Sequence, residues 1–128
     1  MVTTEVGKTI LVIDDSTTNI VLLQAVLNSK GYSIETALNV KDAFNIMNHK
    51  IPDLILLDLL MPRINGFDFL KEIKSDKETK DIPIIVVSAL TDQENIQKAM
   101  LLGANEFITK PVDIQKLVDI VASVFEFK

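Results

Sequence analysis

Four polar segments follow apolar runs of the sequence, and their side chains suit one kind of chemistry. They are Asp14-Asp15, Asp58, Ser88 and Lys110. If the runs are neighbouring strands of a parallel sheet, these groups meet at one edge as an acidic pocket with a hydroxyl and a lysine. A carboxylate beside a divalent cation can attack a phosphoryl group, while the cation and a lysine offset the charge on the transferring oxygens. These residues therefore predict phosphorylation of a carboxylate.

Each of these residue types also has an ordinary structural role after a strand. Aspartate and serine form turns and helix caps, and a lysine before a proline can be a solvated turn residue. The adjacent carboxylates of Asp14 and Asp15 are harder to explain in this way, because Ser16 or Thr17 could cap the following helix instead. Two like charges at a partly buried strand end are costly unless a cation compensates them. Few protein ligands plus several waters suit Mg²⁺, with Mn²⁺ as an alternative.

Short apolar runs alternate along the chain with stretches of helical spacing. Central parallel strands are apolar on both faces, and three runs have this character, with two weaker runs beside them. The runs lie at residues 10–13, 54–57 and 84–87, and the weaker ones at 33–37 and 107–108. Apolar residues at helical spacing follow each run, beginning near Ile20, Val40, Phe67, Ile96 and Ile114. The alternation predicts an α/β fold in which helices cover both faces of a five-stranded parallel sheet.

Capping residues stand at the expected helix ends. Gly31 and Gly103 suit left-handed turns after helices, and N-caps are expected at Asn65, at Thr91 or Asp92, and at Asp113. The predicted helix ends therefore agree with the helices that the apolar spacing predicts.

Composition narrows the classes of protein. The 128 residues are 48% hydrophobic and 24% charged, which fits one domain over residues 1–128. The net charge of −5 and the lack of a long basic run argue against nucleic-acid or anionic-membrane partners. With no cysteine there is no disulfide or thiolate site. No apolar run is long enough for a membrane span, and we expect a cytoplasmic protein.

The motifs in this order resemble the receiver domain of two-component response regulators, including the chemotaxis regulators. They are Asp14-Asp15, Asp58 followed by Met61-Pro62 and Gly66, Ser88-Ala89, and Lys110-Pro111. The likeness runs from about Thr9 to about Phe125, which places the core of the domain at about residues 9–125. It implies a flavodoxin-like three-layer sandwich with strand order 2-1-3-4-5, and phosphoryl transfer to Asp58 from a histidine kinase or a histidine phosphotransfer protein.

The resemblance also assigns a metal site. It implies that Asp15 and Asp58 bind Mg²⁺ through their carboxylates and that Asp14 helps through a water molecule. Leu60 would add its backbone carbonyl.

Other roles come from the same resemblance. Ser88 and Lys110 would contact phosphoryl oxygens, and the Lys110–Pro111 peptide bond would be cis. Phe107 occupies the position of an aromatic switch that turns inward when the hydroxyl residue moves. Being phenylalanine, it has no phenolic group to donate a hydrogen bond.

His49, the single histidine, is interpreted from its position as a solvated residue near the end of the second helix and not as a phosphate carrier.

Leu60 and Leu90 stand two residues beyond Asp58 and Ser88, at positions that flank the path of the hydrolytic water in the family. Neither side chain can hydrogen-bond that water. We expect slow self-dephosphorylation and a long-lived phosphorylated state.

The resemblance also implies an output surface on the fourth helix, fifth strand and fifth helix, at about residues 92–102, 105–108 and 113–125. Phosphorylation would shift this surface between two arrangements, which could promote dimerisation. The sequence leaves open the cognate kinase, the downstream partner, and whether the receiver stands alone or belongs to a longer protein.

Three other classes compete with a phosphorylated receiver. A flavodoxin wants a loop rich in Ser, Thr and Gly for the FMN phosphate, where this chain has Asp14-Asp15, and aromatic rings where it has no Trp and one Tyr. A metal-dependent aspartyl-phosphate phosphatase would share the carboxylates and lysine but usually adds a general acid and a cap domain. The third class is a protein-binding module that is never phosphorylated.

Overall fold

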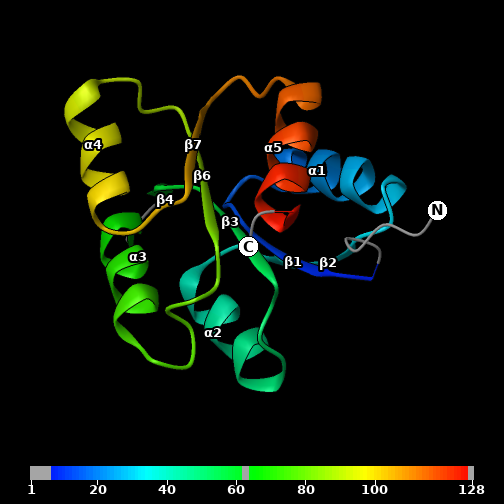
Figure 1. Cartoon of the computed structure of the whole chain (residues 1–128), viewed down its shortest axis with the longest axis horizontal. Helices are drawn as coiled ribbons and strands as arrows, with labels where there is room; N and C mark the ends of the chain where they lie inside the picture. The colour runs from blue at the N-terminus through cyan, green and yellow to red at the C-terminus, as the bar shows by residue number, and fades with distance from the viewer. Residues whose placement is uncertain (1–6, 62–63, 127–128) are drawn as a thin grey trace.

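The computed structural model describes residues 7–61 and 64–126. Strands and helices alternate through most of this length (Figure 1). The elements are β1 (Thr9–Ile13), α1 (Thr17–Ser29), β2 (Ser33–Ala37), α2 (Val40–His49), β3 (Leu54–Leu57), β4 (Leu60–Met61), β5 (Ile64–Asn65), α3 (Gly66–Ser75), β6 (Ile84–Ser88), α4 (Gln93–Leu101), β7 (Glu106–Thr109) and α5 (Ile114–Glu126).

Five parallel strands form the central sheet in the order β2-β1-β3-β6-β7. Numbered within that sheet alone, the order is 2-1-3-4-5, which confirms the expected flavodoxin-like fold. The strand order reverses between β1 and β3, and Ile13 pairs with both Ala37 and Leu57. The carboxyl ends of these three strands therefore lie level with one another.

Helices cover both faces of the sheet. The central strands β1, β3 and β6 are therefore buried on both sides. In Figure 1, α1 and α5 lie on one face, and α2, α3 and α4 lie on the other. The first layer buries Leu27, Leu117 and Val121 against the sheet, and the second buries Leu70 and Ile73. Each fully buried aliphatic side chain of this kind contributes about 1.5–3 kcal/mol.

The helix ends confirm the predicted caps. Side chains of Ser16, Asn65 and Asp92 accept backbone N–H groups in the first turns of α1, α3 and α4. Asp113 Oδ1 likewise accepts the N–H of Lys116 at 3.1 Å. After α1 and α4 the chain turns at Gly31 and Gly103, with φ of 97° and 113°. Glycine adopts this left-handed conformation without the cost of a Cβ.

A two-stranded antiparallel hairpin between β3 and α3 was not predicted. Leu60 of β4 pairs with Asn65 of β5, and Met61 pairs with Ile64. Strands of two residues are too short to give a hydrophobic period. The connecting residues 62–63, including the proline of the Met61-Pro62 motif, lie outside the described residues.

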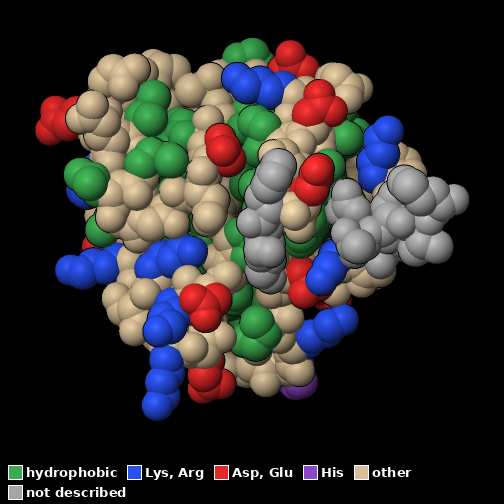
Figure 2. Space-filling view, in the orientation of Figure 1, with side chains coloured by type: hydrophobic (Ala, Val, Ile, Leu, Met, Phe, Trp, Pro, Cys, Tyr) green, Lys and Arg blue, Asp and Glu red, His purple; other side chains and the backbone are tan. Residues whose placement is uncertain are grey.

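Acidic and basic side chains are interspersed on the face drawn in Figure 2. Among residues 7–61 and 64–126, no helix has the length and apolar character needed to cross a membrane.

Candidate functional site

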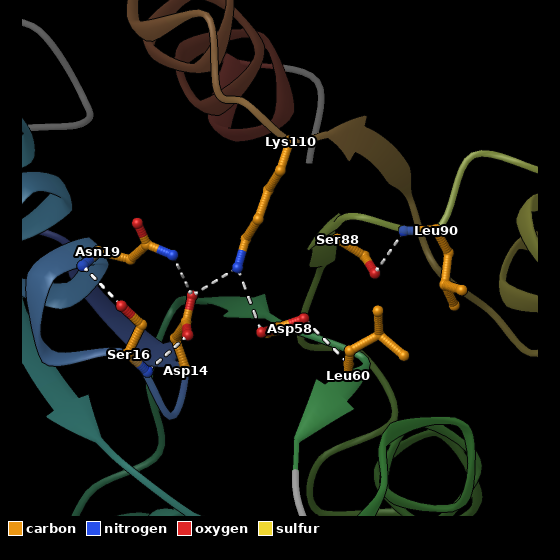
Figure 3. Close-up of polar contacts among 8 residues, drawn as sticks. All are labelled: Asp14, Ser16, Asn19, Asp58, Leu60, Ser88, Leu90 and Lys110. Carbon is orange, nitrogen blue, oxygen red and sulfur yellow. Dashed lines mark hydrogen bonds and ion pairs between the residues drawn. The ribbon is translucent and has the colours of Figure 1, made fainter.

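The predicted site residues come to the carboxyl edge of the sheet from four different strands (Figure 3). Asp14 directly follows β1, Asp58 directly follows β3, and Ser88 is the last residue of β6. Lys110 directly follows β7, and its N–H donates to the carbonyl of Ser88 at 2.8 Å. Backbone pairing continues past the strand ends, because the Asp58 N–H donates to the Ile13 carbonyl at 3.0 Å. The sheet register thus fixes where each functional side chain begins.

Lys110 joins the two buried carboxylates. Its Nζ lies 3.2 Å from Oδ2 of Asp14 and 3.2 Å from Oδ2 of Asp58. Both aspartate side chains are 4% exposed, whereas the lysine side chain is 21% exposed. The two Nζ distances show that the lysine reaches across the sheet edge from β7 to the ends of β1 and β3. The peptide bond from Lys110 to Pro111 is cis, as the resemblance implied.

Asp14 is held by the first turn of α1 as well as by the lysine. Its Oδ1 accepts the N–H of Ser16 at 2.9 Å, and its Oδ2 accepts Nδ2 of Asn19 at 3.4 Å. Sequence reasoning missed Asn19. The available signal was the spacing: Asn19 lies five residues after Asp14, in the first helical turn that Ser16 caps, and so close to the Asp14 carboxylate.

The Asp58 carboxylate accepts fewer hydrogen bonds than the Asp14 carboxylate. Its Oδ1 accepts the N–H of Leu60 at 3.0 Å, and its Oδ2 accepts Lys110. Burial raises the pKa of the Asp58 carboxyl; Leu60 and Lys110 oppose the rise, and the Asp14 charge adds to it. For Lys110, burial lowers the pKa, but the charges of Asp58 and Asp14 together outweigh it and leave the pKa raised. The protein thus favours a charged lysine beside a carboxylate whose charge is costly.

The carboxylates fit a hard divalent cation. One oxygen from each of Asp14, Asp15 and Asp58 can be chosen so that all three lie within 4.8 Å of one another. Asp15 is exposed, so the cluster opens to solvent on that side. Three carboxylates and one lysine leave a formal charge of −2 when all are ionised, and oxygen ligands of this kind suit Mg²⁺.

The residues expected around the phosphoryl group have different degrees of burial. Ser88 is fully buried, and its Oγ accepts the N–H of Leu90 at 3.2 Å. Leu60 is 49% exposed, whereas Leu90 and Phe107 are half-buried against the core on the α2–α4 side. His49 ends α2, where it is exposed. The structure thus brings Asp14, Asp15, Asp58 and Lys110 together, and leaves His49 out of that cluster.

Fold and site together define a flavodoxin-like domain with a carboxylate–lysine pocket where its strand order reverses. Residues 10–122 match the model of the response regulator receiver domain, and the chain belongs to that family. A receiver domain of this family implies phosphorylation-dependent signalling.

Relatives agree with this assignment. The chain is 36% identical over 119 residues to the response regulator PleD of Caulobacter vibrioides, covering 93% of this chain and 26% of PleD. It is 33% identical to the protein PilH of Pseudomonas aeruginosa, covering 90% of this chain and 95% of PilH. The crystal structure of a phosphorylated cyanobacterial phytochrome response regulator, RcpA, superposes with a TM-score of 0.78 at 32% identity, covering 94% and 93% of the two chains. This chain therefore spans about a quarter of PleD but nearly all of PilH.

Proposed function

We propose that this domain is a switch in which Asp58 accepts a phosphoryl group from a phosphohistidine on a histidine kinase or a histidine phosphotransfer protein. In the transfer, the N–P bond of the donor breaks as a carboxylate oxygen of Asp58 bonds to phosphorus, and the leaving imidazole takes up a proton. The observation that carries the proposal is the buried Asp58 carboxylate, which lies 3.2 Å from a lysine and beside two further aspartates. Such a carboxylate can act as a nucleophile, and the lysine beside it can offset charge on the transferring oxygens.

The same carboxylates would hold Mg²⁺, or Mn²⁺ in its place. Asp15 and Asp58 would be direct ligands, Asp14 would act through a water molecule, and Leu60 would supply its backbone carbonyl. When bound, the ion would neutralise charge on the phosphoryl oxygens and orient the group for transfer. A formal charge of −2 in the pocket supports this ligand set.

Lys110 and Ser88 would bind the phosphoryl oxygens after transfer. Lys110 would exchange part of its contact with Asp58 for one to the phosphoryl group, and the Ser88 hydroxyl would turn from the Leu90 N–H to donate to another oxygen. Phe107 on β7 would then turn inward and change the surface formed by α4, β7 and α5. A difference of a few kcal/mol between the two arrangements is enough to reverse their populations.

Leu60 and Leu90 would make the phosphorylated state long-lived. Hydrolysis needs a water molecule aligned with the phosphorus atom, and neither leucine can hydrogen-bond it. The 49% exposure of Leu60 supports a location at the mouth of the site.

The partners beyond the family assignment are also proposals. Receiver domains of response regulators are phosphorylated by histidine kinases, and the RcpA structure is that of a phosphorylated protein. We propose that residues 1–128 act as one receiver domain whose phosphorylation changes contact with a downstream protein or domain, or with a second copy.

Intact mass after incubation with acetyl phosphate tests the proposal, with Mg²⁺ or EDTA, for the wild type and Asp58→Asn. We expect one added phosphoryl group only when both Mg²⁺ and Asp58 are present. An adduct that persists in Asp58→Asn, or no adduct from acetyl phosphate and from a phosphorylated histidine phosphotransfer protein, would overturn the proposal.

A metal-dependent phosphatase would share most of these residues, so the same samples are given p-nitrophenyl phosphate. The receiver modifies only itself, so we expect no sustained release of p-nitrophenol. Continuous turnover that depends on Asp58 would instead support the phosphatase.

A further inference from the structure

Gly66, the first residue of α3, lies unusually close to the loop that follows the phosphoacceptor. A Cβ on this residue would lie 2.5 Å from Leu59 Cα, 2.8 Å from Leu59 O and 3.0 Å from Leu59 C. Carbon atoms in contact settle at about 3.5–4.0 Å, so one side would have to move by about 1 Å. All three contacts are backbone atoms, which cannot rotate away as a flexible side chain can.

The requirement for glycine here is space, not backbone conformation. The φ angles of Gly31 and Gly103 are positive, whereas that of Gly66 lies outside the left-handed region and suits a residue with a Cβ. Glycine is also a poor helix former, costing about 1 kcal/mol relative to alanine inside a helix. The close approach to Leu59 is therefore the physical reason for glycine at this position.

Leu59 lies between two groups of the site. It follows Asp58, and its carbonyl forms the peptide whose N–H, on Leu60, donates to Asp58 Oδ1 at 3.0 Å. Leu59 O and C, two of the three contacted atoms, belong to that peptide. Leu59 cannot simply move outward, because its side chain packs in the core at 3% exposure. Pressure from residue 66 would thus reach the hydrogen bond on the phosphoacceptor carboxylate.

We propose that Gly66 is a positioning residue for the phosphorylation site. The absence of a side chain lets the first turn of α3 pack directly on the Leu59–Leu60 peptide, which aims the Leu60 N–H at Asp58 and sets the Leu60 carbonyl at the cation site. This inference rests on the function proposed above, because the positioned groups are the acceptor and its cation ligand. Residues that orient metal ligands typically change metal affinity by about 10–100-fold when substituted.

Gly103 offers a matched control. A Cβ there would lie 2.8 Å from Cγ of Lys74, and its φ of +113° would strain any L side chain. It lies in the turn before β7, at the amino edge of the sheet, whereas Lys110 follows the carboxyl end of that strand. Gly103→Ala therefore disturbs packing and backbone conformation away from the site.

The test compares Gly66→Ala with Gly103→Ala in unphosphorylated protein. Bound Mn²⁺ is measured by loss of the free-ion EPR signal, exchange of the Leu60 amide by NMR, and stability by urea unfolding. We expect both variants to lose stability, but only Gly66→Ala to bind Mn²⁺ about tenfold more weakly and to exchange the Leu60 amide faster. Phosphorylation by acetyl phosphate should then need about tenfold more Mg²⁺ for the same rate. Wild-type Mn²⁺ affinity and Leu60 exchange in Gly66→Ala would overturn the inference.

A second pair of variants covers the case in which Gly66→Ala does not fold. Asn65 Oδ1 accepts the N–H of Phe67 at 2.9 Å and so holds the turn that contains Gly66. Asn39 makes the same kind of cap on α2, accepting the N–H of Asp42 at 2.8 Å. We expect Asn65→Ala to weaken Mn²⁺ binding severalfold and Asn39→Ala to leave it unchanged; equal affinities would overturn the inference. Wild-type protein that binds Mn²⁺ but is never phosphorylated would contradict only the proposed function.

Discussion

The amino and carboxyl edges of the central sheet use similar polar residues in opposite ways. At the amino edge, Asp53 lies just before β3, and its Oδ2 accepts the N–H of Thr9 at the start of β1, at 2.8 Å. Asn105 lies just before β7, and its Oδ1 accepts the N–H of Ile84 at the start of β6, at 2.9 Å. Each side chain satisfies a backbone donor of the neighbouring strand, which contributes about 0.5–1.5 kcal/mol.

At the carboxyl edge the polar side chains face one another. Two carboxylates, Asp14 and Asp58, are buried beside a single lysine. Burial raises the pKa of the Asp58 carboxyl despite the nearby lysine, so the charged form of Asp58 is costly in this pocket. The comparison indicates that the amino edge stabilises the strand register, whereas the carboxyl edge places a carboxylate whose charge is costly where the proposed function needs a nucleophile.

Loss of the central lysine should have the largest effect. Lys110→Met would leave both buried carboxylates without their shared partner and the transferring oxygens without a cationic donor. We expect phosphorylation by acetyl phosphate to fall by at least about 100-fold, because loss of one preorganised donor to a developing negative charge costs about 10²–10³ in rate. Unfolding in EDTA should become about 2 kcal/mol easier, less than a fully buried pair because the lysine is partly exposed.

Intact mass over time and urea unfolding measure the two effects. Phosphorylation at the wild-type rate would show that the lysine is only structural and would break the contrast between the edges.

A substitution at the mouth of the site should act on lifetime alone. Leu60→Asn supplies a group that can hydrogen-bond a water molecule near the acceptor. We expect dephosphorylation to accelerate about threefold to tenfold, which corresponds to a barrier lowered by about 1 kcal/mol. The decay of the phosphorylated mass after removal of the donor gives the rate. A lifetime that does not shorten would refute the role proposed for the leucine.

A substitution at the amino edge should change stability but not chemistry. Asn105→Ala leaves the buried Ile84 N–H without its acceptor, which costs about 1–2 kcal/mol of unfolding free energy. The phosphorylation rate and Mg²⁺ requirement should match the wild type. If phosphorylation slowed as well, the two edges would be coupled and the comparison would fail.

The sequence predicted most of the fold because the signals were local. The buried strands carry continuous apolar runs, and caps such as Ser16, Asn65 and Asp113 follow from residue type and spacing. Strand ends in a parallel sheet meet at one edge, so the sequence alone predicts that Asp14, Asp58 and Lys110 lie together.

Contacts between distant segments were not predictable in the same way. The hydrogen bond from the Ile84 N–H to Asn105 Oδ1 depends on the strand order and on the orientation of the Asn105 side chain. No local sequence pattern predicts either of these. The β4–β5 hairpin has no period to detect, and the space that Gly66 leaves for Leu59 depends on how α3 packs on the loop. The motif pointed to Gly66 without giving the reason for it.

The most direct test of the central claim is the unfolding free energy of wild type and Asp58→Asn in urea, in EDTA and in saturating Mg²⁺. In EDTA the variant should be at least as stable as the wild type, because it removes a costly buried charge and leaves Lys110 paired with Asp14. Mg²⁺ should stabilise the wild type by about 2.7 kcal/mol at 100 times its dissociation constant, and the variant by much less. A variant less stable than wild type in EDTA, with no difference between the two in their response to Mg²⁺, would show that Asp58 is a structural residue and contradict the account.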